Sequence, residues 1–556
     1  MARRGHVYPQ VEVAAGDLVN ARLASASASA TSREALARVR AAGAVAVVLG
    51  GRVARVVLRE DLARAVALGL EELPAVALAR PVPTVAPHVS EGRLRLVRRR
   101  GAAPVVRVGT GSAADGAVTG LAGPPAVALA DRFARALPDA ARDVLEAAGA
   151  AAATHGGRAF AVGGLVRDTL RGGVAERVDL DIAVEGDGLG VARALAGHLG
   201  GEVVEHRRFL TASVTGTSAG RVDVATCRSE RYETPGALPR VMPATIEEDL
   251  ARRDFSVNAL AVDLRSGAFD LLDPLGGRRD LDRGRLRVLH PLSFVEDPTR
   301  MLRAARYAER LGFALDAWSA RSQALALRLA PYDALSGERL ASELERVLAD
   351  VRPAATLTRL GRAGVFRLLD PRYRFDDTTK RRLAQLPAAL DWTRIVGVPV
   401  SALELLGLAL TASQPRGVAE ACLARLALRG EPLARLLKAR EDAASVAARL
   451  RTAEGAAART RTLADRASVE LAWLWLTGDD ALRGELDAVV TAGRAARPVL
   501  RGDEVIALGV PRGPQVARVL TALRDARLDG AVHDRTGEAA WVRAWVREER
   551  PGAKEG

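Results

Sequence analysis

The stretch that most constrains the fold is residues 160–184, where a short apolar run meets a pair of glycines. Residues 160–162 are apolar, Gly163 and Gly164 follow, and residues 165–170 are compatible with a helix. This order predicts a strand, a tight turn and a helix that has the glycines at its N-terminus. The first N–H groups of a helix have no intrahelical acceptor, so they can bind a phosphate. A plain turn is the alternative when the glycines are considered alone.

A second pattern lies at the end of the same stretch, in residues 178–184, which alternate along their length. Such alternation predicts a β-strand from which Asp179 and Asp181 project on one face. Two neighbouring carboxylates repel each other unless a cation lies between them, and hard oxygen ligands beside a phosphate site suit Mg²⁺. For this pair alone, a solvated strand edge is the alternative.

Two arginine-containing motifs follow further along the chain. Residues 252–259 read RRDFSVNA, and its adjacent arginines would point in different directions on a helix, so that one can meet a nucleotide while the other braces the fold. Residues 297–306 hold one aspartate and three arginines at intervals of three, which a helix would carry as a slowly winding stripe. Such side chains present donors and acceptors in fixed planes and can read the edge of a base. The alternatives are an exposed ionic helix face for the first motif and an intrahelical salt-bridge ladder for the second.

The order of these motifs, GG-x-V-R-D, D-x-D-I-A, RRDFSVNA and E-D-x-x-R, resembles that of the class II tRNA nucleotidyltransferases, the CCA-adding enzymes and their bacterial relatives. In that family the last motif, here Glu296, Asp297 and Arg300, reads the base. Ser256 stands where the family usually has Thr, and it keeps the hydroxyl group. The resemblance covers about residues 130–350 strongly and the chain to residue 532 weakly. It implies nucleotide transfer onto an RNA 3′ end, with two Mg²⁺ ions.

The resemblance also assigns roles to single residues. Asp179 and Asp181 would hold the metal as catalytic residues, and a third carboxylate from a neighbouring strand, for which Asp223 is the candidate, would complete the site. A strand-edge carboxylate paired with Arg221 or Arg228 is the competing interpretation of Asp223. The expected nucleotide-binding residues are Gly163, Gly164, Arg167, Asp168, Arg253, Asn258, Asp297, Arg300, Arg303 and Arg306.

Charge and composition restrict the partners. The formal net charge of +14 favours a polyanion. RNA is preferred over a membrane, because the sequence contains no long apolar span and no basic amphipathic helix. The expected partners are tRNA and ATP, with CTP as a possible second nucleotide. Cys227 and Cys422 are isolated thiols, which favours a reducing cytoplasm, and the histidines form no metal-ligand pair, which argues against a zinc hydrolase.

The expected fold class is α+β: a nucleotidyltransferase head with a mixed sheet, followed by an all-helical neck, body and tail, and preceded by an α/β module. The β-β-α order of that module recurs weakly and resembles a pair of CBS domains, which in many proteins bind adenine nucleotides. Their usual Thr or Ser three residues before an Asp is broken in each copy, since Leu58 precedes Asp61 and Thr119 precedes Ala122. A structural or docking role is therefore favoured over ligand sensing.

The expected segments are an N-terminal extension (1–17), the degenerate CBS-like pair (18–124), the catalytic head (125–285), the neck with the base-reading motif (286–350), the body (351–480) and a tail for tRNA binding (481–556). Within them, residues 126–153 are Ala-rich and predict a helix. Residues 227–249 contain three prolines and no periodicity, which indicates a long loop. Residues 371–399 are expected to form a loop-rich joint.

Three activities share these motifs: full CCA addition, partial addition of CC or of the terminal A, and poly(A) tailing. The full-length loop before RRDF argues against CC addition. The CBS-like fusion and the phrase ETPGALP at residues 233–239 resemble the A-adding subgroup. Terminal AMP addition to tRNA ending in CC is therefore favoured. The alternatives are a full CCA-adding enzyme using CTP and ATP, a poly(A) polymerase and, outside this class, a non-catalytic RNA-binding or nucleotide-sensing protein.

Overall fold

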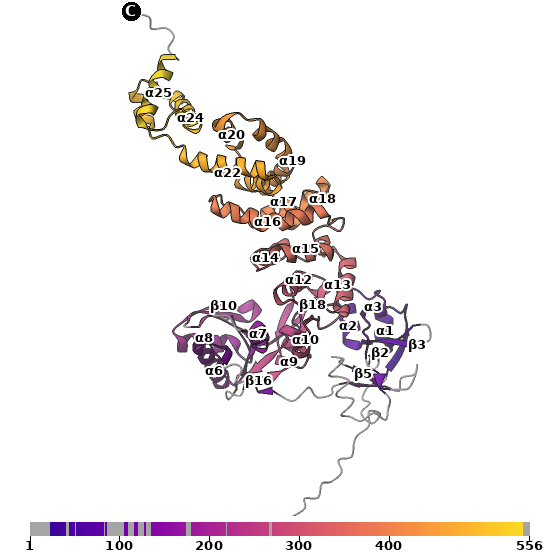
Figure 1. Ribbon diagram of the computed structural model, residues 1–556. Coiled ribbons are helices and arrows are strands. Elements are labelled where there is room, and N and C mark those ends of the chain that lie inside the picture. Colours follow the sequence, from indigo (N-terminus) through magenta and orange to yellow (C-terminus); the bar gives the residue numbers. More distant parts are fainter. Residues whose placement is uncertain are drawn as a thin grey trace, which may run out of the picture. The chain divides into compact units, whose positions relative to one another are not determined.

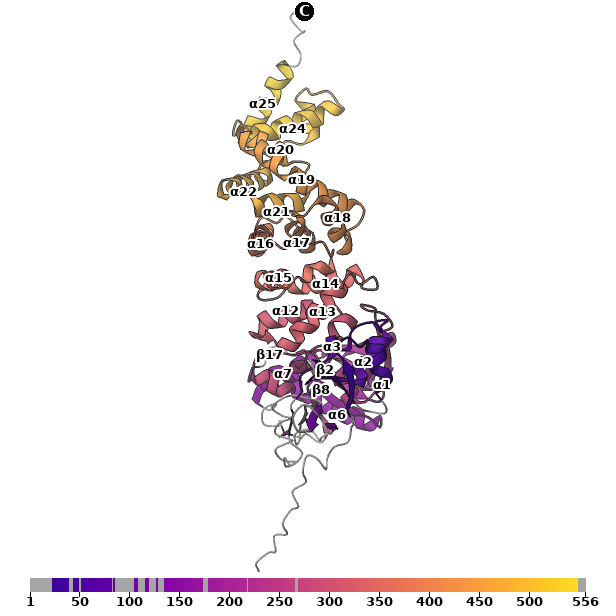
Figure 2. The same cartoon turned by 90° about the vertical axis from the view of Figure 1, so that its right-hand side faces the viewer.

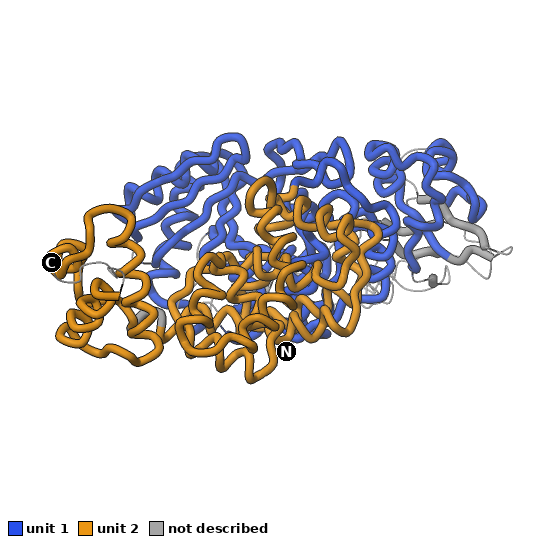
Figure 3. The backbone as a smooth tube through the Cα atoms, turned by 90° about the horizontal axis from the view of Figure 1, so that it is seen from above, with its two compact units in different colours: residues 1–336 blue, residues 337–556 orange. Residues whose placement is uncertain are grey.

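The computed structural model describes residues 23–39, 44–49, 52–82, 84–85, 105–108, 116–119, 127–128, 135–173, 179–217, 219–265 and 269–548. The chain divides into two compact units, residues 1–336 and 337–556 (Figure 3). This division falls inside the expected neck, and the other expected domain boundaries stay predictions. The expected N-terminal extension lies outside the described residues.

The centre of the first unit is a mixed sheet of eight strands in the order β10–β11–β12–β9–β8–β15–β16–β7. Strands β12 and β9 are parallel, and every other neighbouring pair in this sheet is antiparallel. The strands are β7 (Val127–Ala128), β8 (Arg158–Val162), β9 (Leu180–Glu185), β10 (Glu202–His206), β11 (Thr211–Thr217), β12 (Gly220–Thr226), β15 (Ala261–Asp263) and β16 (Asp270–Leu272). The mixed sheet that was expected for the head is thereby confirmed.

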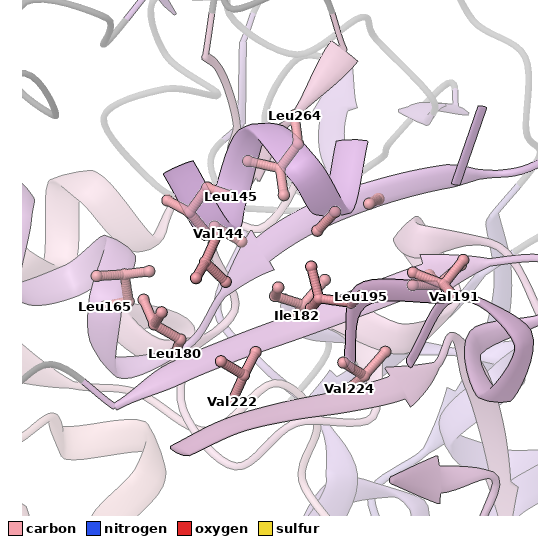
Figure 4. Packing of buried hydrophobic residues seen from close by; sticks show 14 of the residues in the cluster. Val144, Leu145, Leu165, Leu180, Ile182, Val191, Leu195, Val222, Val224 and Leu264 are labelled. Carbon is pink, nitrogen blue, oxygen red and sulfur yellow. The ribbon is translucent and has the colours of Figure 1, made fainter. Parts of the chain in front are cut away.

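Helices α6 (Asp139–Thr154) and α8 (Gly188–Leu199) cover one face of this sheet (Figure 1). Their apolar side chains form one core with those of the two parallel strands, and the close view labels Leu180, Ile182, Val222 and Val224 in it (Figure 4). Because successive side chains of a strand alternate between faces, the residues between these apolar ones lie on the other face. The core therefore fixes which side of the sheet carries the acidic residues.

The opposite face is covered by a second, smaller apolar cluster. It joins Phe160 and Ala183 of the sheet to Ile246 and Leu250 of the short helix α9 (Ile246–Ala251). The acidic residues of β9 and β12 thus leave the sheet on the side where α9 packs.

Two stretches of the head differ from the expectations. The Ala-rich stretch of residues 126–153 is not one helix, because it begins with the edge strand β7 and α6 starts only after Pro138. Proline fits the start of a helix but disfavours the helical conformation of the residue before it.

The expected loop of residues 227–249 contains an antiparallel hairpin of β13 (Arg228–Arg231) and β14 (Arg240–Pro243), and then the start of α9. A capping box formed by Thr245 and Glu248 begins that helix. The hairpin strands are short and polar, so they leave no apolar period in the sequence.

The described part of the N-terminal module contains two three-stranded sheets of the same arrangement. In each, the first strand is parallel to the second, and the third strand is antiparallel to the second. The recurrence agrees with a repeated unit, and the CBS resemblance itself stays a prediction. The elements are β1 (Leu23–Ser27), α1 (Ser32–Arg38), β2 (Ala44–Leu49), β3 (Arg52–Leu58), α2 (Arg59–Ala67), α3 (Ala75–Leu78), β4 (Thr84–Val85), β5 (Val105–Val108) and β6 (Gly116–Thr119).

The remaining elements of the first unit carry the sequence motifs. A small parallel sheet, β17 with β18, lies beside them. These elements are α7 (Gly164–Leu170), the 3₁₀ turn Ser256–Asn258, α10 (Gly277–Asp282), β17 (Arg285–Leu286), α11 (Ser293–Glu296), α12 (Thr299–Leu311), β18 (Ala314–Leu315) and α13 (Ala317–Leu329).

The second unit is largely helical, which confirms that part of the expected fold class. Its helices follow one another in chain order from α14 and α15 to α24 and α25 (Figures 1 and 2). They are α14 (Gly337–Leu348), α15 (Pro353–Arg362), α16 (Asp377–Ile395), α17 (Ala402–Thr411), α18 (Arg416–Arg425), α19 (Glu431–Thr452), α20 (Gly455–Leu463), α21 (Ser468–Thr477), α22 (Asp480–Ala495), α23 (Gly502–Ala507), α24 (Pro514–Leu528) and α25 (Arg535–Glu548).

The expected loop-rich joint at residues 371–399 is wrong for most of its length, because α16 is a helix of 19 residues with Pro387 in its interior. Tertiary packing outweighs the local cost of the proline, since Leu383, Leu386 and Ala389 are buried around it. Among the described helices, none combines the length and the apolar character needed to cross a membrane.

Candidate functional site

Two of the predicted carboxylates lie side by side on neighbouring parallel strands. Asp181 of β9 and Asp223 of β12 are register partners, so their side chains leave the sheet on the same face. Asp179 lies directly before β9 and is exposed. Burial raises the pKa of Asp181 to about 6, and the negative charges of Asp223 and Asp179 act in the same direction while Arg253 opposes them. The three carboxylates therefore share one electrostatic environment.

Asp223 also has protein partners of its own. Its carboxylate accepts hydrogen bonds from Ser213 Oγ at 2.5 Å and from Arg221 Nε at 3.0 and 3.1 Å. The pairing with Arg221 that was considered as an alternative is thus present together with the position beside Asp181. Arg228 lies against Glu230 instead, with 3.6 Å between Nε and Oε1.

The glycine turn lies at the same place. Gly163 has a φ of +69°, and a Cβ atom on it would be 3.6 Å from Asp181 Oδ2 and 3.4 Å from Arg253 Nη1. The turn thus brings the start of α7 next to both a carboxylate and a guanidinium. Because α7 begins at Gly164, its first N–H groups have no acceptor within the helix.

A buried carboxylate that the sequence analysis did not single out orients the two adjacent arginines. Asp249 Oδ1 accepts from Arg252 Nη2 at 2.7 Å, and its Oδ2 accepts from Arg253 Nη2 at 2.8 Å. Arg252 also donates to Glu230 at 2.7 Å, whereas Nη1 of Arg253 points to the glycine turn. These arginines hold the pKa of Asp249 below its usual range against the effect of burial. The spacing of Asp249 three and four residues before the arginines on a helix was the signal that could have revealed it.

Arg167, which was expected to bind the nucleotide, is 4% exposed, and all three nitrogen atoms of its guanidinium group donate hydrogen bonds. Its Nε and Nη2 donate to the carboxylate of Asp168 at 2.9 and 2.7 Å, and its Nη1 donates to Asn258 Oδ1 at 2.8 Å. Asn258 donates in turn to Asp254 at 3.1 Å, and Arg303 of α12 lies 2.6 Å from the other oxygen of Asp254. This network joins four predicted nucleotide-binding residues into one connected support.

Asp297 does not lie on the helix with the three arginines, contrary to the expected stripe. It adopts an extended conformation between α11 and α12, because Pro298 follows it and disfavours a helical conformation there. Its Oδ1 accepts from the N–H of Thr299 at 3.0 Å and from the hydroxyl of Thr299 at 2.6 Å, so it tethers the start of α12.

The arginines of α12 have unequal surroundings. Arg300 is 4% exposed and donates to Ser293 Oγ at 2.7 Å and to the carbonyl of Arg252 at 2.8 Å. The guanidinium of Arg306 lies 5.5 Å from the centre of the Tyr307 ring, close to the 5.6 Å that separates Arg167 from the same ring. Arg300 thus links α12 to the RRDFSVNA segment.

The acidic residues match the ligand type that Mg²⁺ prefers, because carboxylate oxygens are hard donors. Burial and the two neighbouring carboxylates raise the pKa of Asp181, and a bound cation would oppose this rise. In the part of the chain that the structure describes, no three Asp, Glu, His or Cys side chains are arranged as a ready metal-binding group.

The chain is similar to several known proteins. Residues 159–287 match the model of the poly A polymerase head domain. An A-adding tRNA nucleotidyltransferase of Geobacter sulfurreducens is 33% identical over 68% of this chain and 44% of its own length. A CC-adding tRNA nucleotidyltransferase of Deinococcus radiodurans is 37% identical over 69% of this chain and 88% of its own length. An apo CCA-adding enzyme structure superposes with a TM-score of 0.67 at 26% identity, covering 76% of this chain and 99% of that one. The chain spans less than half the length of the A-adding relatives that it matches.

Proposed function

The chain belongs to the family of tRNA nucleotidyltransferases, and we propose that it adds the terminal AMP to tRNA ending in CC, with ATP as the donor. The similarity to A-adding relatives supports this choice, since three of them are 33%, 41% and 36% identical to the chain over their matched parts. The ETPGALP phrase of residues 233–239 supports it as well. Its glycine lies against the base-reading motif, because the N–H of Gly236 donates to the carbonyls of Val295 and Glu296 at 3.1 and 3.2 Å.

In the proposed reaction, the 3′-hydroxyl of the RNA attacks the α-phosphate of ATP and pyrophosphate leaves. Asp179 and Asp181, with Asp223, would hold two Mg²⁺ ions. When bound, such ions lower the pKa of the attacking hydroxyl and neutralise charge on the phosphates. Without cations, the negative carboxylates would repel the phosphates of ATP. Binding of the phosphates at this face of the sheet would therefore require the cations and the positive charge of Arg253.

The remaining residues would bind and orient the nucleotide. The first N–H groups of α7, which begins at Gly164, and the Nη1 of Arg253 would donate to the phosphates. Arg167, Asp168, Asn258 and Arg303 would act through their shared network, which fixes α7 against α12.

Asp297 and Arg300 would read the base in this proposal, and Arg306 would complete the nucleotide site. In the structure, Arg300 donates hydrogen bonds to Ser293 and to the carbonyl of Arg252. To read a base, Arg300 would have to donate hydrogen bonds to it. It could use N–H groups that these two partners do not occupy, or N–H groups released from them.

One observation carries the proposal more than any other. Asp181, its register partner Asp223, the turn at Gly163 and the Nη1 of Arg253 come together at a single point of the first unit, although they originate from four segments of the sequence. A carboxylate pair beside a phosphate-binding turn is the arrangement that metal-assisted nucleotidyl transfer requires.

CC addition is a second candidate, because the CC-adding relative is matched over 88% of its own length. Full CCA addition needs the same groups and both CTP and ATP. A non-catalytic RNA-binding role would not explain why three carboxylates are grouped at one site, where they would repel the RNA phosphates.

The decisive experiment incubates the protein and Mg²⁺ with tRNA that ends before CC, after one C, and after CC, each with labelled ATP or labelled CTP. We expect AMP incorporation on tRNA ending in CC and no CMP incorporation on any of the three. Efficient CMP incorporation would contradict A-specific addition, and long A tails would favour poly(A) synthesis. Tight tRNA binding without any incorporation would support the non-catalytic alternative.

A further inference from the structure

The glutamate of the base-reading motif is held by an arginine from outside the head. Glu296 Oε1 lies 2.8 Å from Nε of Arg64, which is in α2 of the N-terminal module. Its other oxygen, Oε2, lies 3.1 Å from Nε2 of His290. Both carboxylate oxygens of Glu296 are therefore occupied by side chains, one of them contributed by a segment more than 200 residues away in the sequence.

The surroundings make this contact strong. The side chains of Glu296 and His290 are 9% and 7% exposed, whereas that of Arg64 is 35% exposed. Burial lowers the pKa of His290, and Arg64 acts in the same direction, so the histidine is neutral near pH 7. His290 therefore supplies a hydrogen bond but no charge. Arg64 is the cation that pairs directly with this buried carboxylate, and an unpaired buried charge is costly.

Arg64 is itself aligned by its own module. Its Nη1 lies 3.8 Å from Asp61 Oδ1, and the buried Asp61 is also paired with Arg80. The guanidinium of Arg80 lies 4.9 Å from the ring of Trp318 in α13. Asp61, the aspartate of the broken CBS motif, thus contacts both Arg64 and Arg80, two arginines that reach residues of the segment from 290 to 329.

The main chain next to Glu296 is fixed as well. Its carbonyl accepts from the N–H of Gly236, and the next residue is Asp297, which tethers the start of α12. The residue that Arg64 contacts is thus the direct chain neighbour of Asp297 and lies four residues before Arg300.

We propose that Arg64 is a positioning residue for nucleotide binding, through which the N-terminal module fixes Glu296 and thereby the Asp297–Arg300 pair. The inference rests on the proposed function of this pair. It assigns the module a mechanical part in the site, and it requires no ligand of the module.

The test compares Arg64→Ala with Arg33→Ala in the full chain. Arg33 is an exposed arginine of the same module, and its ion pair with Glu71 stays within the module. We expect Arg64→Ala to raise the KM for ATP about tenfold with a smaller change in kcat, and Arg64→Lys to restore part of the loss. Arg33→Ala should leave both constants unchanged.

A double-mutant cycle separates positioning from general stability. In a Glu296→Gln background, Arg64→Ala should raise the KM by less than twofold, because the charge on which Arg64 acts is gone. An Arg64→Ala effect of equal size in both backgrounds would overturn the inference, as would an Arg64→Ala enzyme that matches Arg33→Ala. A wild-type chain without any nucleotide incorporation would contradict the proposed function, and the inference with it, whereas the two preceding outcomes would leave that function intact.

Discussion

Asp181 on β9 and Asp223 on β12 occupy the same register of a parallel strand pair, and their side chains share the sheet face that is turned away from α6 and α8. The apolar neighbours of both residues are anchored in the core, so neither side chain can turn to the other face without unpacking Leu180, Ile182 or Val224 (Figure 4). The repulsion between the carboxylates is therefore built into the fold, and several measurable consequences follow from it.

Replacing Asp181 by Asn should lower the rate of nucleotide incorporation at least about 100-fold. The amide keeps the shape of the side chain but loses the charge that binds a cation. Binding of tRNA, measured by filter retention, should change little. Asp187→Asn is the matched control, since Asp187 caps α8 on the surface and Asn caps a helix equally well. Retained turnover in Asp181→Asn would disprove its assignment as a metal ligand.

The pH dependence of stability provides a second prediction. Because the pKa of Asp181 is raised to about 6 in the folded chain, its protonated form contributes stability that is complete below the unfolded value near 3.8 and is lost as the pH rises through 6. In a chelator at pH 8, Asp181→Asn should therefore be more stable than the wild type by about 2 kcal/mol. The two proteins should melt together at pH 4. A scanning calorimeter measures both, and equal melting at pH 8 would contradict the shared carboxylate environment.

Substitutions of the adjacent residues Arg252 and Arg253 should affect different properties of the protein. Arg253→Ala removes the guanidinium that points to the Gly163 turn, so it should raise the KM for ATP about tenfold. Arg252→Ala removes the contacts with Glu230 and Asp249 inside the head, so it should mainly lower the melting temperature. Each variant leaves Asp249 paired with the other arginine. Equal effects of both changes on KM would show that the two roles are not divided in this way.

Gly163→Ala and Gly172→Ala form a matched pair at the two ends of α7. Both glycines have a positive φ, at +69° and +83°, so each change should cost of order 1–3 kcal/mol of stability. Only at Gly163 would the new methyl group meet the site, at 3.6 Å from Asp181 Oδ2, whereas nothing lies within 4 Å at Gly172. Nucleotide incorporation should therefore fall much further in Gly163→Ala. A similar loss in both variants would mean that the turn affects activity only through stability.

Local sequence patterns explain why part of the fold and of the site could be predicted from the sequence. The alternation in β9 and β12, the glycine turn before α7 and the arginine motifs are short-range features, because one strand face or one helix turn is set by residues within four positions of each other. Errors occurred where local pattern and packing disagree, as in the polar hairpin β13–β14 and in α16 around Pro387.

Sequence by itself determined which chemical groups this protein has and in which order: the acidic strand, the diglycine turn and the arginines of the two later motifs. Only the tertiary structure decided which groups share a space. The register of Asp223 with Asp181 and the contact of Arg64 with Glu296 both join residues from different elements. Such contacts depend on how strands pair and cores fill, and these are collective properties of packing that no single segment encodes.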